Sequence, residues 1–178
     1  MDADFPNIFF TADVAELLKI PEWRVIKFSQ SAEYQITPSH SDATGSGSRR
    51  VYDLEDVSKM ALAVQLLDSG LGSKTIGEIM LQIKRKNGQR LSDKLKLTET
   101  ELHYLCLAIF RPQKRGKYLY MTRPREVLFV STIGDAVVEH TERAGDDLLL
   151  VTIGEAFEKL ARRLKVFQKR KEKKHGSV

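Results

Sequence analysis

A short stretch of the chain, residues 21–30, carries polar side chains that suit contact with nucleic acid. Trp23, Lys27 and Gln30 recur at the spacing of one helix face, and Arg24 lies beside them. Lys and Arg bind phosphates or guanine, Gln reads adenine, and Trp packs on a sugar or on the thymine methyl group. Because any amphipathic helix also exposes a polar face to water, the surrounding elements must decide whether this face binds DNA.

Two short helices are expected to hold this face. Thr11 is a suitable N-cap for a helix that runs through Leu18. Pro21 then opens the second helix, because a first turn does not need the N–H that proline lacks. Val25 and Phe28 of that helix are expected to face inward. Such a pair has the order of a helix-turn-helix, in which the second helix enters the major groove.

A wing is expected after the two helices. Two extended pieces, residues 34–37 and 49–52, flank a loop that is rich in Ser, Gly, Thr and Asp. Two strands around such a loop form a wing. It offers His40, Arg49 and Arg50 to the neighbouring DNA backbone.

Two longer amphipathic helices are predicted to complete the N-terminal part. Asp53 begins the first, with the acidic Asp56 in its first turn, and Gly70 ends it. Ser73 begins the second, whose apolar positions continue to Ile83. Both helices therefore have a face to bury against a common core.

With these elements in order, residues 10–83 resemble the DNA-binding domain of the MerR family of bacterial transcription regulators. The resemblance implies a winged helix-turn-helix in a homodimer that binds a roughly palindromic site on double-stranded DNA. The recognition helix would lie in the major groove and the wing on the backbone. The matching features are Thr11 with the helix through Leu18, the recognition helix Ile20 to Phe28, Arg50-Val51-Tyr52 at the end of the wing, Leu54-Glu55-Asp56-Val57, and Gly70-Leu71-Gly72-Ser73 with Ile76 and Ile79.

The distribution of charge keeps a second interpretation open. The chain has 178 residues and a net charge of +5. Residues 1–83 carry 7 basic and 12 acidic side chains, a net charge of −5, whereas residues 84–125 carry 12 basic and 3 acidic ones, a net charge of +9. Phosphates repel carboxylates. The alternative is therefore a winged-helix protein-interaction module without DNA-binding activity, with Trp23 and Phe28 as its contacts.

The C-terminal part is expected to be a small mixed α/β domain for dimerisation or effector binding. We predict the division 1–83, a basic linker 84–97, and 98–178. Within the last range Thr98 opens a short helix, and strands are predicted at 104–110, 117–122 and 127–131. A final helix is predicted to begin at Thr152 and to fray in the basic tail 169–174. Its apolar stripe is either a dimer seam or core, and consists of Phe157, Leu160, Ala161, Leu164 and Phe167.

No residue pattern indicates an enzyme, a cofactor or a metal site. The four histidines lack metal-ligand spacing, and the single Cys106 lies in an apolar run, where a buried structural thiol is expected. No apolar run is long enough to span a membrane, and the acidic N-terminus does not resemble a secretion signal. We expect a cytoplasmic α+β protein. The sequence does not name a small-molecule or protein effector.

Overall fold

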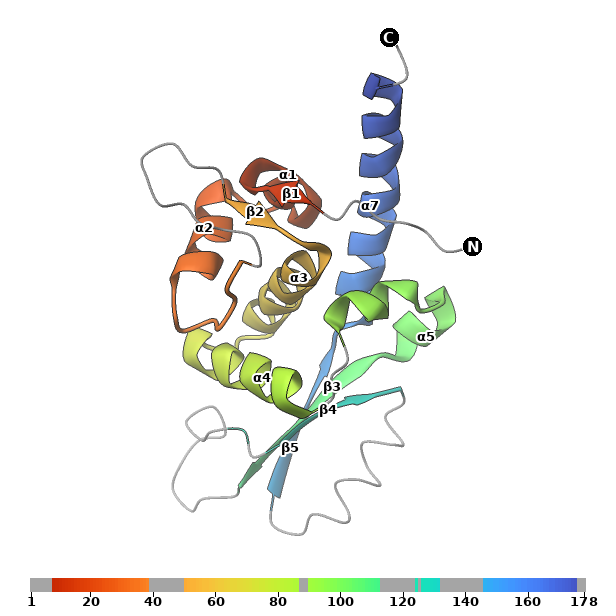
Figure 1. Cartoon of the computed structure of the whole chain (residues 1–178). Coiled ribbons are helices and arrows are strands. Elements are labelled where there is room, and N and C mark those ends of the chain that lie inside the picture. Colours follow the sequence, from red (N-terminus) through yellow and green to blue (C-terminus); the bar gives the residue numbers. More distant parts are fainter. Residues whose placement is uncertain are drawn as a thin grey trace.

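The computed structural model describes residues 8–38, 50–86, 90–112, 124, 126–131 and 146–175. The chain is α+β, with most helices gathered at one end and a three-stranded sheet at the other (Figure 1). Its elements in order are β1 (Phe9–Phe10), α1 (Thr11–Leu18), α2 (Glu22–Gln30), β2 (Val51–Tyr52), α3 (Leu54–Asp68), α4 (Ser73–Lys86), the 3-10 helix η1 (Leu91–Lys96), α5 (Glu99–Tyr104), β3 (Cys106–Pro112), β4 (Glu126–Val130), β5 (Asp146–Thr152) and α7 (Gly154–His175).

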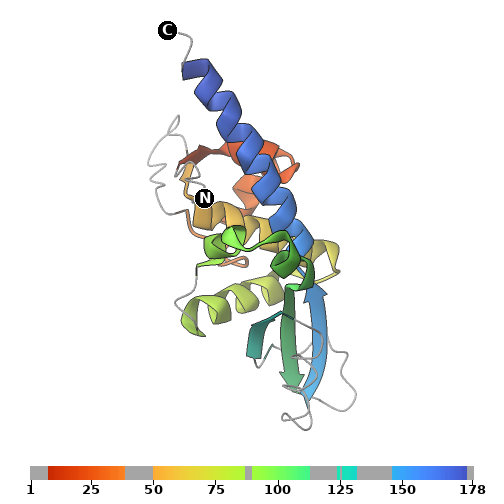
Figure 2. The same ribbon diagram turned by 90° about the vertical axis from the view of Figure 1, so that its right-hand side faces the viewer.

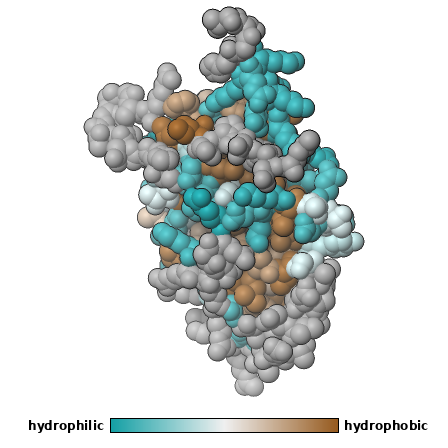
Figure 3. All heavy atoms as spheres, turned by 45° about the vertical axis from the view of Figure 1, so that its right-hand side comes forward, coloured by the Kyte–Doolittle hydropathy of each residue, from teal (hydrophilic) through white to brown (hydrophobic). Residues whose placement is uncertain are grey.

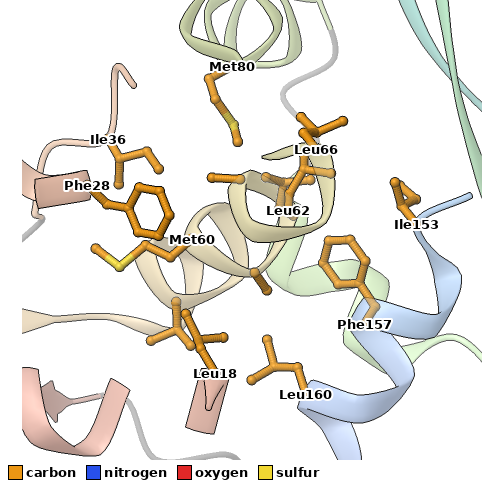
Figure 4. Close-up of a cluster of buried hydrophobic side chains, with 14 of the residues drawn as sticks. Leu18, Phe28, Ile36, Met60, Leu62, Leu66, Met80, Ile153, Phe157 and Leu160 are labelled. Atoms are coloured by element: carbon orange, nitrogen blue, oxygen red, sulfur yellow. The ribbon is translucent and has the colours of Figure 1, made fainter. Parts of the chain in front are cut away.

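Helix α3 lies at the centre of the helical core. Its Met60, Leu62 and Leu66 are fully buried. Figure 4 shows side chains from the neighbouring elements converging on α3, among them Phe28 of α2 and Phe157 of α7. Burying apolar side chains removes them from water and is the main stabilising contribution to such a core. The helices are therefore held by one shared cluster around α3.

The sheet has the strand order β4-β3-β5, and both pairings are antiparallel. In the central strand Ile109 lies opposite Val127 of β4 and Leu149 of β5. Side chains of successive strand residues point to opposite faces. Ile109 therefore joins the helical core, whereas its neighbours Ala108 and Phe110 belong to a second apolar cluster on the other face.

Helix α7 leaves the sheet and runs along the helical end of the molecule (Figure 2). Its apolar stripe is buried in the core of its own chain, with Phe157 and Leu164 at 0% exposure. The Phe167 ring lies 6.0 Å from the Phe9 ring of β1. The structure therefore supports the interpretation that the stripe is part of the core. These side chains cannot form a dimer seam, because other residues of the same chain already cover them.

The predicted division into 1–83, 84–97 and 98–178 stays a prediction, but packing crosses both of its boundaries. One core cluster extends from Phe9 to Phe167. Within the predicted linker, η1 buries Leu91 and Leu95. The side-chain Nε2 of Gln65 in α3 also donates to the carbonyl of Thr152 at 3.0 Å. The described elements are thus packed together across the predicted boundaries.

The strands predicted for the wing are wrong in their pairing. Residues 34–37 form no strand. Instead β2 pairs with β1, with Phe9 opposite Tyr52. Pairing with β1 satisfies the backbone hydrogen bonds of β2, and it also places the Phe9 side chain completely in the core. The loop residues 39–49, including the predicted contacts His40 and Arg49, lie outside the described residues.

Two predicted helix starts are also displaced. Phe10, not Thr11, is the N-cap of α1, because the Asp13 carboxylate accepts from the Phe10 backbone N–H at 2.9 Å. Thr152 belongs to β5, and α7 begins at Gly154. The helix then continues through the basic tail to His175, so the predicted fraying is not seen.

Other predicted elements are confirmed with small shifts. Strand β3 begins at Cys106 rather than at Tyr104, which ends α5. Thr98 and Glu101 cap α5 reciprocally: Thr98 N donates to Glu101 Oε2 at 2.7 Å and Glu101 N to Thr98 Oγ1 at 3.3 Å. The backbone hydrogen bond from Thr98 lowers the pKa of Glu101. The strand predicted at 117–122 lies outside the described residues, and β5 was not predicted.

The capping box of α3 gives a first testable prediction. Asp53 Oδ1 accepts from Asp56 N at 2.8 Å, and Asp56 Oδ2 accepts from Asp53 N at 3.2 Å. Replacing Asp53 by Ala removes the cap of the central helix, and we expect a loss of about 1 kcal/mol in the free energy of unfolding. Asp53→Asn keeps a capping oxygen and should retain most of it. Chemical denaturation checks this, and equal losses in both variants would contradict the capping role.

Candidate nucleic-acid interface

Helix α2 exposes three of the predicted DNA-contacting side chains along one face. Trp23 is 64% exposed, and Lys27 and Gln30 are exposed too. Val25 and Phe28 lie on the opposite side and are fully buried. This division follows from the helical repeat, because residues three and four apart share a face. The predicted inward and outward sides of α2 are therefore confirmed.

A hydrogen bond and an aromatic contact hold α2 in place. The hydroxyls of Ser29 in α2 and Tyr52 in β2 lie 3.2 Å apart. Beneath the helix, the Phe28 and Tyr34 rings meet edge to face with centroids 4.9 Å apart. Burial raises the pKa of the Tyr34 hydroxyl, and nearby Arg24 opposes that shift. The exposed face thus belongs to a helix, α2, that contacts β2 and also the turn that follows α2.

Arg24 and Arg50 occupy less exposed positions than the other predicted contacts. The Arg24 guanidinium carbon lies 5.9 Å from the centroid of the Phe28 ring, and the side chain is half-buried. Arg50 is half-buried as well and immediately precedes β2. The hydroxyl groups of Tyr52 in β2 and Ser29 in α2 form a hydrogen bond. This bond holds β2, the strand that follows Arg50, against α2, the helix that carries Trp23.

The acidic side chains of α1 are compensated by the basic end of α7. Arg170 Nη1 lies 2.7 Å from Glu16 Oε1, and Lys171 Nζ lies 3.9 Å from Asp13 Oδ2. Figure 3 shows hydrophilic side chains following α7 toward its C-terminal end. Exposed ion pairs add little to stability, but these two offset carboxylates of α1, the helix that packs against α2. Helix α7 therefore offsets two of the acidic side chains of residues 1–83, whereas Glu22 of α2 and Glu33 in the turn after α2 remain exposed.

A further hydrogen bond fixes α7 against α1. Arg163 Nη1 donates to the backbone carbonyl of Leu17, near the C-terminal end of α1, at 2.8 Å. Helix C-termini carry carbonyls without intrahelical partners and attract cations. Sequence reasoning missed this role of α7, because its partners lie far away along the chain: 154 positions separate Arg170 from Glu16. The opposite charges of the two segments were the only available signal.

The rest of the described chain offers little other chemistry. None of its His, Cys, Asp and Glu residues gather in groups of three that could hold a metal ion. Cys106 is buried, as predicted, and burial raises the pKa of its thiol. A thiol of raised pKa is a poor nucleophile at neutral pH. None of the described helices has the length and apolar character needed to cross a membrane.

Comparisons of the chain with protein-family models and with curated proteins found no match.

Proposed function

We propose that this protein is a sequence-specific DNA-binding transcriptional regulator with a MerR-like winged helix-turn-helix. In this proposal α2 enters the major groove, and the loop between α2 and β2 contacts the phosphate backbone as the wing. Trp23, Arg24, Lys27 and Gln30 make the contacts of α2, and Arg50 adds one at the base of the wing. His40 and Arg49 are further wing contacts in this scheme.

One observation carries the proposal: the exposed polar face of α2 on a helix with a buried opposite side. The face combines an aromatic ring, a cation and an amide, which are the groups that read base edges and phosphates. Its opposite side is fixed by Phe28 in the core and by Ser29 on Tyr52. A helix that is firmly held presents such groups at low cost in conformational entropy.

Charge compensation supports the same proposal. Affinity for DNA depends on Lys and Arg near phosphates, and it is weakened by nearby carboxylates. Arg170 and Lys171 of α7 offset the carboxylates of Glu16 and Asp13 on α1, the helix that packs against α2, while Glu22 of α2 stays exposed. Because charges beyond about 8–10 Å are screened at physiological salt, this local balance matters more than the net charge of the segment.

Dimerisation and cytoplasmic localisation are parts of this proposal. A two-fold dimer would place two α2 helices on half-sites one helical turn apart. The apolar stripe of α7 does not serve as its seam, because that stripe lies in the core. Sedimentation measures whether the chain forms a dimer, and crosslinking then identifies the residues of the dimer surface.

A second candidate function is a protein-interaction module on the same surface. The observation that favours it is Trp23, which is 64% exposed, because exposed Trp residues are frequent anchors of protein interfaces. Phe28 does not contribute as the sequence suggested, since it is fully buried. Binding to a protein through Trp23 would depend little on salt, whereas binding to DNA would weaken steeply as salt rises.

Selection of duplexes from a random pool tests the proposed function. Full-length protein is incubated with the pool at about 100 mM salt, and bound duplexes are amplified and sequenced through several rounds. We expect enrichment of a roughly palindromic motif, with footprinting protection of both halves. Absence of any enriched motif, together with no retention of DNA at low salt, would favour the protein-interaction module.

A further inference from the structure

A small cavity lies between the segment that follows α2 and three helices, α3, α4 and η1. Its volume is about 230 Å³. Most ligand pockets occupy roughly 300–1,000 Å³, so this one admits only a small ligand. Met80 and Ile83 of α4 and Leu91 of η1 give it an apolar wall, and all three side chains are buried.

Two cations stand at this cavity without a carboxylate partner among the described residues. Lys84 lies near the end of α4 and Arg90 immediately before η1, and both line the cavity and are exposed. Neither forms a salt bridge with any residue that the structure describes. Most exposed cations are simply solvated. These two differ because they flank a cavity with an apolar wall.

The other charged groups of the cavity are already engaged. Lys59 Nζ lies 3.8 Å from Glu55 Oε1 and 3.9 Å from Asp56 Oδ1. Glu55 also accepts a hydrogen bond from the Ser92 backbone N–H at 2.9 Å. Of the charged residues in the lining, three are basic and one is acidic. This excess of positive charge favours an anionic ligand. The Glu55 carboxylate would repel a ligand with several negative charges, so a singly charged anion fits best.

The wall formed by Gln35 and Thr37 carries a strained backbone at Gln35. Gln35 has a φ of 55°, in the left-handed region that side chains with a Cβ seldom adopt. Its side-chain amide donates to the Ala32 carbonyl at 2.6 Å, which supports this conformation. Strained residues of this kind gather at ligand sites and switch regions. This observation is independent of the charges of Lys84 and Arg90.

We propose that this cavity binds a small organic carboxylate with an apolar body. Lys84 and Arg90 donate charge-assisted hydrogen bonds to the carboxylate. The apolar body packs against Met80, Ile83 and Leu91. Occupancy joins the segment that follows α2 to α4 and η1, so a ligand that binds here also restrains the strained wall at Gln35.

Binding is measured on the full-length protein by NMR, with methyl groups of Met, Ile and Leu labelled. Benzoate is the probe, and benzyl alcohol is the control, because it has the same ring without the charge. We expect saturable shifts of the Met80, Ile83 and Leu91 methyl signals with benzoate, and at least about tenfold weaker binding of benzyl alcohol. One charge-assisted hydrogen bond is worth about that factor.

Two double variants test whether Lys84 and Arg90 bind the carboxylate group of benzoate. Lys84→Ala with Arg90→Ala should weaken benzoate binding at least about tenfold. Lys96→Ala with Lys159→Ala removes the same charge from exposed positions elsewhere and should leave binding unchanged. The methyl spectra also report whether each variant is folded. Equal binding of benzoate and benzyl alcohol, no saturable shift, or unchanged binding in the first variant would each overturn the proposal. None of these outcomes depends on DNA binding.

Discussion

Simultaneous replacement of Arg24, Lys27 and Arg50 by Ala is expected to weaken DNA binding by roughly 100-fold. We expect each side chain to contribute about 1 kcal/mol to the binding free energy, which is near the lower limit for such contacts. The three together contribute about 3 kcal/mol. These side chains are exposed or half-buried, so the fold should survive. Titration of a selected duplex, followed by fluorescence anisotropy, measures the decrease in affinity.

A charge-matched variant separates surface contact from net charge. Lys96, Lys159 and Lys165 are exposed on η1 and α7, on the other side of α3 from α2 (Figure 1). Replacing them by Ala removes the same charge and is expected to change affinity by less than about threefold. If this control weakens binding as much as the first variant does, the contact surface does not lie on α2.

Gly77→Ala is expected to destabilise the protein and to disturb α2 from a distance. Gly77 lies in α4, where a Cβ would meet the backbone carbonyl oxygen of Glu33 at 1.8 Å. In an ordinary helix, Ala would be favoured over Gly by about 1 kcal/mol. Here overlap with rigid backbone outweighs that gain, and we expect a net loss of about 2 kcal/mol. The melting temperature should fall by roughly 4–8 °C.

The effect on α2 follows from where Glu33 lies. Glu33 is in the turn directly after α2, and its carboxylate accepts from the Ser73 hydroxyl at 2.6 Å. If α4 shifts, this turn shifts with it. Gly72→Ala is the control for the steric overlap, because nothing lies within 4 Å of its Cβ position. Gly72 precedes the first residue of α4, where Ala is a poorer N-cap than Gly, so its loss should stay below about 1 kcal/mol. A Gly77→Ala protein as stable as the wild type would contradict the close approach of α4.

The helices of the N-terminal half were predictable because their signals are local. Asp53 with Asp56 marks the start of α3, and the positive φ of Gly70 suits the turn after it. The inward side of α2 followed from the spacing of Val25 and Phe28. Caps and periodicity act within a few residues, so one sequence contains all the information that they need.

Strand pairing and helix docking were not predictable in this way. Strand β1 has only two residues, and nothing near Phe9 indicates that its partner is Tyr52. Strand β5 lacks the alternation of apolar and polar residues that marks a strand. Leu149 packs against the helical core, Leu148 and Leu150 pack against the second cluster, and all three are half-buried. The choice among distant partners depends on packing of the whole chain, which local patterns do not report.

The salt dependence of binding tests the central claim most directly. The affinity of the wild type for a selected duplex is measured between about 50 and 200 mM salt, and the Arg24, Lys27 and Arg50 variant is measured in parallel. Binding through phosphates predicts a linear fall of log affinity with log salt concentration, and the slope should flatten by about 0.9 for each phosphate that the variant no longer neutralises. A wild-type affinity that does not change with salt, or equal slopes for the two proteins, would contradict DNA binding through α2 and the wing.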